Sequence, residues 1–275
     1  MARLRTAIIG SGNIGTDLLV KVLRSPLLEC TAFIGRNLGS PGMSKAAQLG
    51  VRVSDRSIAF LEKDPDCCDL VFDATSAADH VRHAPILRRL GKIAVDLTPA
   101  MLGIMCSPAV NVEESLKSHN VNMITCGGQA SIPLAYALAQ CHKEIEYIEV
   151  VSSIASRSAG PATRYNLDEY IHTTELGIKH FSGCRKAKAI LNLNPALPCV
   201  NMQTTLLAQV VRPDIPAYKE HLAAVLKRVR HYVPGYEILV GPVVENGRIV
   251  VMARVRGLGD FLPEYAGNLD IINCA

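Results

Sequence analysis

The chain has 275 residues, of which 49% are hydrophobic and 20% charged, and its formal net charge is +4. The length predicts two domains, and the composition excludes a disordered chain. Scattered Lys and Arg residues do not indicate nucleic-acid binding, and no apolar run approaches the ~18 residues of a membrane span. The nine cysteines form no Cys-x-x-Cys pair and the N-terminus has no signal-peptide core, so we expect a soluble, cytoplasmic protein without disulfides or structural zinc.

The first motif is a glycine-rich turn between a strand-like run, 5–9, and a helical run, 16–24. The turn consists of Gly10, Ser11, Gly12, Asn13, Ile14 and Gly15. In such a G-x-G-x-x-G turn the first glycine makes the tight turn, the second admits a pyrophosphate and the third lets helix and strand pack closely. The strand before it and the helix after it favour a dinucleotide-binding Rossmann unit over a glycine-rich turn that binds nothing.

The end of the second expected strand, 28–34, bears on the type of dinucleotide. A Rossmann unit usually places an acidic residue there for the ribose hydroxyls, but this chain has Gly35, Arg36 and Asn37. Arg36 could accommodate a 2′-phosphate, which would favour NADP. The alternative is a solvent-facing Arg36 with Asn37 hydrogen-bonded to the ribose of NAD.

Strands and helices alternate through the rest of the first half, which predicts a parallel, doubly wound sheet. The expected elements are a helix at 43–49, strands at 51–53 and 92–96, a buried strand that leads into a small-residue turn at 69–76, and a helix at 77–90. His80 and His83 lie three residues apart on the last of these helices. Without a third ligand, a solvated polar face is the better interpretation than a metal site.

A cysteine ends the next apolar run, 121–125. Cys126 is followed by Gly127 and Gly128 and then by a helical segment that starts near Ala130. A thiol beside the N–H groups and the positive end of a helix is expected to favour the thiolate. The glycines would allow unusual φ angles and a backbone oxyanion site, as covalent catalysis requires. The alternative is a buried cysteine at a glycine turn.

Strands outnumber helices in the second half, which predicts an α+β domain with an open sheet that packs against a second copy of the chain. The expected strands are 144–154, 187–193, 204–211, 237–240 and 248–256, and the expected helices are 167–181 and 213–232. Asn246-Gly247 predicts a hairpin turn, and Gly183 is expected to end the 167–181 helix.

A loop rich in small residues and hydroxyls connects the first of these strands to the 167–181 helix. It contains Arg157 and Arg164, and Asn166 is well suited to cap the helix that follows. The loop could hold a phosphate, or it could be an ordinary connection with solvent-facing arginines. His172 and His180 are expected on the helix surface, so no general base is assigned.

Five segments together resemble the acylating acetaldehyde dehydrogenases of aromatic meta-cleavage pathways. The segments are Ser11 to Ile14, Asp96 to Ala100, Asn122 to Ala130, Ser158 to Asn166 and Tyr265 to Ile271. The resemblance implies an N-terminal Rossmann domain over 1–125, an α+β catalytic and dimerisation domain over 126–260, and a C-terminal segment, 261–275, that returns to the cofactor domain. It also implies a 4-hydroxy-2-oxovalerate aldolase as partner, which passes acetaldehyde to the dehydrogenase.

The same resemblance assigns roles to individual residues. Cys126 would carry an acyl thioester, NAD would be the cofactor, and coenzyme A would be the co-substrate that takes the acetyl group. The residues that would contact NAD are Gly10, Ser11, Gly12, Asn13, Ile14, Gly15, Ser158, Ala159, Gly160, Pro161, Ala162, Thr163, Arg164, Tyr165, Asn166 and Asn268.

Three features depart from the family's pattern. Thr204 stands where the family usually has an aspartate, and a threonine cannot accept a proton at neutral pH. The segment between Tyr236 and Arg248 is short, and so is the helix that begins near Leu269. Two other functions remain open: a cysteine dehydrogenase that uses phosphate on a semialdehyde, and a non-catalytic dinucleotide sensor in which Cys126 only packs.

Overall fold

The computed structural model describes residues 2–275, which form two compact units. The first unit contains residues up to 105 with 113–123 and 160–166, and the second contains 106–112, 124–159 and 167–275. These units differ from the expected contiguous segments. The 160–166 loop belongs to the first unit, and the C-terminal segment 261–275 groups with the second unit instead of the first. Its helix contacts α6 and β12 of the second unit.

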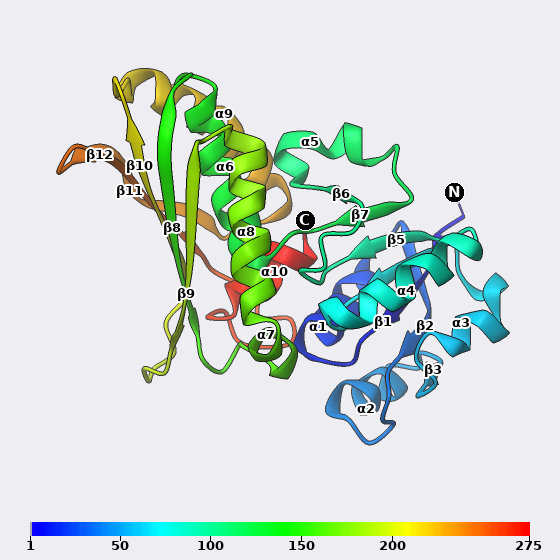
Figure 1. Ribbon diagram of the computed structural model, residues 1–275. Helices are drawn as coiled ribbons and strands as arrows, with labels where there is room; N and C mark the ends of the chain where they lie inside the picture. Colours follow the sequence, from blue (N-terminus) through cyan, green and yellow to red (C-terminus); the bar gives the residue numbers. More distant parts are fainter. Residues whose placement is uncertain (1) are drawn as a thin grey trace. The chain divides into compact units, whose positions relative to one another are not determined.

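The first unit is built on a seven-stranded, entirely parallel sheet with the strand order β3-β2-β1-β4-β5-β7-β6 (Figure 1). Its strands are β1 (Leu4–Ile9), β2 (Leu28–Ile34), β3 (Val53–Ser54), β4 (Leu70–Asp73), β5 (Ile93–Asp96), β6 (Ile104–Met105) and β7 (Asn120–Asn122). Its helices are α1 (Asn13–Arg24), α2 (Pro41–Gln48), α3 (Ala59–Lys63), the 3-10 turn η1 (Pro65–Cys67), α4 (Ala77–Arg89) and α7 (Pro161–Tyr165). Helix α5 (Pro108–Ser115) is kinked at Asn111 and has residues in both units.

The strand order confirms the predicted doubly wound arrangement. The connection from β1 through α1 moves outward to β2, whereas the connection from β4 through α4 moves outward in the opposite direction to β5. Because such crossovers are right-handed, α1 and α4 cover opposite faces of the sheet. The strand order therefore reverses between the parallel neighbours β1 and β4. Ligands of this fold bind outside the carboxyl ends of the strands at that point.

The central strands of this sheet are buried on both faces, which explains their continuous apolar sequence. Ala7, Ile8 and Ile9 of β1 are at most 1% exposed, and Val71 of β4 is fully buried. Ala7, Ile9 and Val71 pack with Leu87 of α4 in the core of the unit. The rigid core therefore holds the loops at the carboxyl ends of β1, β2 and β4 in place.

The second unit is a five-stranded sheet with the order β11-β12-β10-β8-β9, antiparallel except for the β8–β9 pair. Its strands are β8 (Ile145–Ala155), β9 (Lys186–Asn194), β10 (Met202–Val210), β11 (Tyr236–Glu245) and β12 (Arg248–Val255). Its helices are α6 (Cys126–Ala139), α8 (Leu167–Ser182), α9 (Ile215–Tyr232) and the short α10 (Gly267–Asn273).

Burial alternates along the central strand of this sheet. Met202, Thr204, Leu206 and Ala208 of β10 are at most 1% exposed, while the residues between them are half-buried. The buried side packs with apolar side chains of α6, α8 and α9. This one-sided core confirms the expected α+β arrangement with an open sheet face.

Two predicted chain reversals have the expected backbone. Asn246 and Gly247 have φ angles of 49° and 73° between the paired strands β11 and β12, as a tight hairpin turn requires. Gly183, at a φ of 66°, ends α8, and its N–H group donates to the Lys179 carbonyl at 2.8 Å. Across residues 2–275, no helix has both the length and the apolar character needed to cross a membrane.

Candidate functional site

The β1–α1 turn brings three glycines into different steric roles. Gly10 has a φ of +116°, and a Cβ atom there would lie 2.4 Å from the Ala74 carbonyl oxygen. A Cβ atom on Gly15 would lie 1.9 Å from the Gly10 carbonyl oxygen. Around Gly12, in contrast, no atom lies within 4 Å of the Cβ position. Gly10 and Gly15 are therefore required by packing, while Gly12 leaves open space.

Gly12 also precedes the first residue of α1, which has 12 residues. As the N-cap, glycine has no side chain that could accept hydrogen bonds from the first N–H groups of the helix. The N–H groups at a helix N-terminus and the helix dipole favour an anionic group. The turn is thus shaped for a phosphate.

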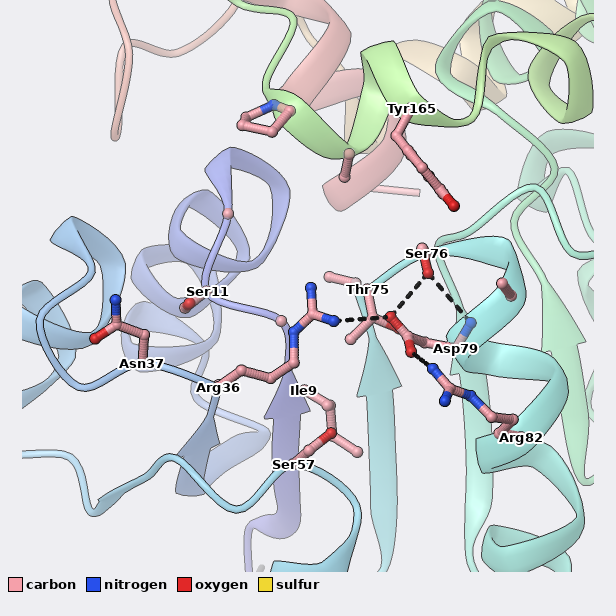
Figure 2. A pocket seen from close by; sticks show the side chains of 17 residues that line it. Ile9, Ser11, Arg36, Asn37, Ser57, Thr75, Ser76, Asp79, Arg82 and Tyr165 are labelled. Carbon is pink, nitrogen blue, oxygen red and sulfur yellow. Dashed lines mark hydrogen bonds and ion pairs between the residues drawn. The ribbon is translucent and has the colours of Figure 1, made fainter.

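A cavity of about 680 Å³ lies against this turn within the first unit (Figure 2). Its volume is in the range of small-molecule sites. Five segments form its wall: the β1–α1 turn, the end of β2, the β3–α3 connection, the β4–α4 turn with the start of α4, and helix α7. The lining residues are Ile9, Gly10, Ser11, Gly12, Gly35, Arg36, Asn37, Ser57, Ala74, Thr75, Ser76, Ala78, Asp79, Arg82, Pro161, Ala162 and Tyr165.

Two arginines meet one carboxylate in the wall of this cavity. Arg36 Nη1 lies 3.7 Å from Asp79 Oδ2, and Arg82 bonds the other oxygen of Asp79 (Figure 2). Ser76 Oγ donates to Asp79 at 2.8 Å. Burial raises the pKa of Asp79, but the hydrogen bonds from Ser76 and Arg82 and the charge of Arg36 together lower it below its ordinary value. The charged lining therefore carries a net charge of +1 (two arginines, one carboxylate).

The loop expected to contact the cofactor is divided between the two units after Ala159. Ser158 is buried in the second unit, where its hydroxyl donates to the Ala155 carbonyl at 2.8 Å. In the first unit Pro161, Ala162 and Tyr165 line the cavity.

The other predicted residues of these segments have different surroundings. Asn166 accepts a hydrogen bond from the backbone N–H of Ala77, the first residue of α4, at 3.3 Å. It therefore caps a helix 89 residues away in sequence, in place of the α8 cap that we expected. Thr163 and Arg164 do not belong to the cavity lining. In the second unit Asn268 is 4% exposed on α10, and its Oδ1 atom has no hydrogen-bond partner within residues 2–275.

Cys126 is the first residue of α6 in the second unit, and the residues just before it are constrained. Thr125 is the N-cap, and its hydroxyl oxygen accepts the Gly128 N–H at 2.8 Å. Ile124 is fully buried with a φ of +66°, a conformation that costs a β-branched residue about 1–3 kcal/mol. The surrounding structure thus holds this turn in one strained shape.

Two expectations about Gly127 and Gly128 were wrong. Both glycines are helical residues of α6, so they do not provide unusual φ angles, and the Gly128 N–H, one of the groups expected at an oxyanion site, donates to the cap instead. Their lack of a side chain has a packing reason. A Cβ atom on Gly127 would lie 2.1 Å from the Tyr170 hydroxyl oxygen, and one on Gly128 would lie 2.7 Å from an Ile124 methyl carbon.

The half-buried Cys126 sulfur lies 3.6 Å from the Tyr170 hydroxyl oxygen. Burial raises the pKa of the Cys126 thiol, whereas hydrogen bonds from Tyr170 and from the Gly127 and Cys126 backbone lower it by less. The expected net preference for the thiolate was therefore wrong, because desolvation outweighs the helix terminus. Tyr170 lies 44 residues from Cys126, and no local sequence pattern pointed to it.

Thr204 lies beside this turn but offers no carboxylate. Its hydroxyl is 3.0 Å from the Ser152 hydroxyl, and both residues are at most 2% exposed. Ser152 in turn lies 3.0 Å from the Cβ position of Gly127. The position flagged in the sequence therefore contributes a neutral hydroxyl pair next to the cysteine turn.

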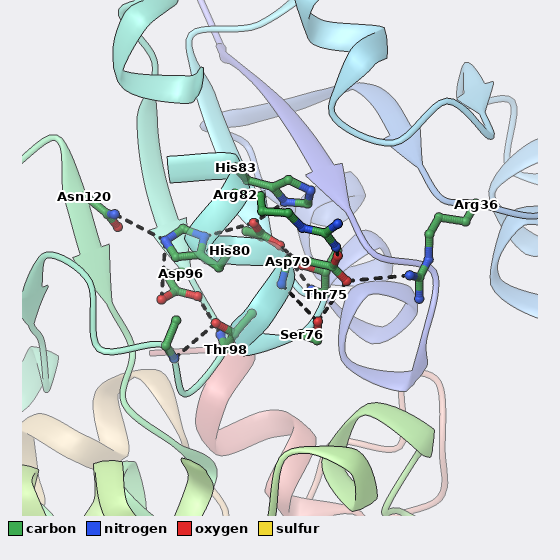
Figure 3. Close-up of polar contacts among 12 residues, drawn as sticks. Arg36, Thr75, Ser76, Asp79, His80, Arg82, His83, Asp96, Thr98 and Asn120 are labelled. Carbon is green, nitrogen blue, oxygen red and sulfur yellow. Dashed lines mark hydrogen bonds and ion pairs between the residues drawn. The ribbon is translucent and has the colours of Figure 1, made fainter. Parts of the chain in front are cut away.

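A second set of buried polar groups lies in the first unit, where α4 covers the ends of β4 and β5 (Figure 3). His80 Nδ1 and His83 Nδ1 bond one oxygen of Asp73 at 2.9 and 2.8 Å, and His80 Nε2 is 3.5 Å from Asp96. All four residues are at most 3% exposed. The expectation that the two histidines form a solvated face was wrong, because buried strand-end carboxylates lie beneath them.

The protonation of this cluster is uneven. Burial raises the pKa of both carboxyl groups, but the two histidines outweigh it at Asp73 and bring that pKa well below its ordinary value. At Asp96 burial prevails and the pKa rises to about 6. The pKa of His80 is raised, because its two carboxylate neighbours outweigh burial. The contribution of this cluster to stability at the ends of β4 and β5 therefore depends on pH.

Comparison with known proteins identifies the family. Residues 126–263 match the family described as prokaryotic acetaldehyde dehydrogenase, dimerisation. The chain is 60% identical over 272 residues to the acetaldehyde dehydrogenase of Spirochaeta aurantia, and the match covers 99% of this chain and 92% of that protein. The acetaldehyde dehydrogenase of Pectobacterium atrosepticum is 55% identical over 275 residues, with 99% and 93% covered.

The fold is shared more widely. The solved structure of aspartate semialdehyde dehydrogenase with NADP from Candida albicans has a TM-score of 0.66 at 11% identity, and the match covers 99% of this chain and 98% of that one. At that identity the likeness concerns the fold alone, whereas the matched family and the close relatives decide membership: this chain belongs to the acetaldehyde dehydrogenase family.

Proposed function

We propose that this protein oxidises acetaldehyde, or another short aliphatic aldehyde, to its coenzyme A thioester with a nicotinamide dinucleotide as oxidant. The observation that carries the proposal is Cys126 itself: in a chain of the acetaldehyde dehydrogenase family, the residue begins a helix directly behind a strained turn. Strained backbone concentrates at functional sites, so the turn supports a catalytic role better than simple packing.

The first unit supports the dinucleotide part of the proposal. The open space at Gly12, the N-terminus of α1 and the cavity beside them fit a pyrophosphate with an adjoining nucleoside. When bound, the nicotinamide supplies the hydride acceptor. NAD is the proposed cofactor, and NADP is the alternative that Arg36 leaves open.

The chemistry of the chain itself is covalent catalysis. The Cys126 sulfur, as thiolate, adds to the aldehyde carbon while the carbonyl π electrons move to the oxygen, which gives a thiohemiacetal. Loss of hydride from that carbon leaves an acyl thioester on Cys126. The coenzyme A thiol loses its proton to solvent and adds to the thioester carbonyl, and the Cys126 sulfur departs with its bonding electrons as the thiolate.

Replacement of the proposed nucleophile tests the function. Cys126→Ser should abolish coenzyme A-dependent reduction of NAD measured at 340 nm, while circular dichroism shows a retained fold. Cys199→Ser, in the loop between β9 and β10, is the matched control and should keep wild-type activity. A Cys126→Ser enzyme with more than about a tenth of wild-type activity would contradict the proposal, because loss of an essential nucleophile costs several powers of ten.

A second candidate, left open by the sequence, is a cysteine dehydrogenase that acts on a semialdehyde and in which phosphate replaces coenzyme A. The same assay separates the two, with acetaldehyde plus coenzyme A in one arm and a semialdehyde plus phosphate in the other. Faster turnover in the phosphate arm would make the chain a phosphorylating dehydrogenase. Equal inactivity in both arms, with unchanged thiol reactivity in the presence of aldehyde, would favour a dinucleotide sensor.

The assembly is also part of the proposal. The open face of the five-stranded sheet belongs to the segment that matches a dimerisation family, which supports a homo-oligomer formed through that face. Light scattering coupled to size-exclusion chromatography tests the proposed homo-oligomer. A monomer at micromolar concentration would contradict it. The resemblance to meta-cleavage enzymes adds an aldolase partner in aromatic catabolism, which co-purification with a tagged chain would test.

A further inference from the structure

The Cys126 sulfur has one side-chain hydrogen-bond partner within residues 2–275, the Tyr170 hydroxyl at 3.6 Å. No charged side chain contributes to the pKa of the thiol. A nucleophilic cysteine usually has an imidazole or a cation beside it, and Thr204 provides neither a base nor a charge. The group that stabilises the thiolate must therefore be a neutral donor.

Tyr170 is built into the turn and does not merely pass near it. The residue is 6% exposed on α8, and the absent side chain of Gly127 leaves the room that its hydroxyl occupies, 2.1 Å from the Cβ position. Any larger residue in place of Gly127 would displace the phenol from the sulfur.

A directed chain of hydrogen bonds ties the two helices together at this point. The Gly128 N–H donates to the Thr125 hydroxyl at 2.8 Å, the Thr125 and Thr174 hydroxyls are 2.7 Å apart, and the Thr174 hydroxyl donates to the Tyr170 carbonyl at 2.7 Å. Because Thr174 uses its proton on that carbonyl, Thr125 is the donor between the two threonines. The cap that holds Cys126 thus also holds the backbone of Tyr170.

The direction of the Tyr170–Cys126 hydrogen bond follows from the two acidities. Burial, followed by the neighbouring sulfur, raises the pKa of Tyr170 well above its ordinary value, so the phenol keeps its proton at neutral pH. The same contact lowers the pKa of the thiol against the larger effect of burial. The phenol is therefore the donor, and the sulfur is the acceptor.

We propose that Tyr170 is a catalytic hydrogen-bond donor that stabilises the Cys126 thiolate and, once the sulfur has added to the aldehyde, the negative oxygen formed next to it. The thiol proton leaves to solvent before the addition, and Tyr170 keeps its own proton throughout, so the step needs no further base. Since charge passes from sulfur to oxygen and later returns, a donor that stays protonated can serve both atoms. This inference rests on the proposed role of Cys126.

The test is the pH dependence of Cys126 alkylation, which needs neither aldehyde nor cofactor. Iodoacetamide labelling is followed by mass spectrometry of the Cys126 peptide from pH 6 to 10.5 in wild type and in Tyr170→Phe. A hydrogen bond to a charged group corresponds to about one pKa unit or more, so the midpoint should rise by about one unit and kcat/KM should fall at least about tenfold. An unmoved or lowered midpoint would overturn the proposal, even if turnover fell.

Tyr218→Phe is the matched control. Tyr218 is fully buried and Tyr170 is 6% exposed, and the Tyr218 hydroxyl donates to the Leu134 carbonyl of α6 at 3.0 Å, so this variant removes a buried phenol that bonds the same helix. It should leave the alkylation midpoint unchanged. An equal shift in both variants would also overturn the proposal, because it would trace to general loosening of α6. If Cys126→Ser remained active, the proposed function would be refuted. The alkylation titration would still test whether Tyr170 stabilises the Cys126 thiolate.

Discussion

Removal of the Thr125 hydroxyl should destabilise the second unit by a predictable amount. The hydroxyl accepts the Gly128 N–H at 2.8 Å, and Thr125 is only 4% exposed, so water cannot replace it. Loss of an N-cap costs about 1 kcal/mol, and a buried donor left without a partner costs about 1–3 kcal/mol. These two figures describe the same lost interaction, so Thr125→Val, which keeps the shape, should lower the free energy of unfolding by about 2 kcal/mol.

Urea unfolding followed by circular dichroism measures this change, with Thr125→Ser as the control. Serine keeps the cap and loses one buried methyl group, which costs about 1 kcal/mol. The valine variant should also lose turnover, because the cap fixes the start of α6 where Cys126 lies. If serine were as destabilising as valine, methyl packing and not the hydrogen bond would explain the loss, and the cap argument would be refuted.

Three further outcomes follow from the first unit. Gly12→Ala should keep its free energy of unfolding within about 0.5 kcal/mol of wild type, since its Cβ position is open, yet should bind NAD more weakly in calorimetry. Gly10→Ala should lower the free energy of unfolding in urea by at least about 2 kcal/mol, because alanine is strained at a φ of +116°. If Arg36 contacts a 2′-phosphate, Arg36→Ala should weaken binding of 2′,5′-ADP about tenfold and binding of 5′-ADP less than twofold. Arg164→Ala, outside the cavity lining, is the control. If Arg36→Ala weakened binding of both nucleotides equally, Arg36 would not contact the 2′-phosphate. Asp96 has a pKa of about 6 in the folded chain against 3.8 as its ordinary value, so the folded state holds that proton more tightly and loses stability as the pH rises from 4 through 6. Asp96 also helps to raise the pKa of His80, and this contribution to stability is likewise lost as the pH rises. Asp96→Asn should therefore flatten the fall in urea midpoint between pH 5 and 7.5. An unchanged slope would contradict this.

Much of the fold could be predicted because its signals are local. The glycine turn, the alternation of strands and helices and the Asn246-Gly247 hairpin depend on residues within a few positions of one another, and each has the predicted form. The same holds for the placement of Cys126 between an apolar run and a helix, although the helix begins at Cys126 itself and not near Ala130. In these cases backbone geometry and hydrophobic pattern restrict the chain before any tertiary contact forms.

The errors share a different cause. His80 and His83 have polar sequence neighbours that suggest a surface helix, but the carboxylate that binds them ends a strand on another segment. Asn166 is a suitable cap for the helix that follows it, yet it bonds Ala77 at the start of α4. Side-chain type shows that a hydrogen bond will be made, and only the packed chain decides with which partner.

The sequence by itself determined that a cysteine lies between an apolar run and a helix, in a chain that opens with a dinucleotide turn. Tertiary structure decided the acidity of that cysteine. Burial raises the pKa of the Cys126 thiol, and the largest effect that opposes burial is the hydrogen bond from Tyr170 on α8. Desolvation and long-range hydrogen bonds depend on what surrounds a group in space, and a pattern of neighbours along the chain does not contain that information.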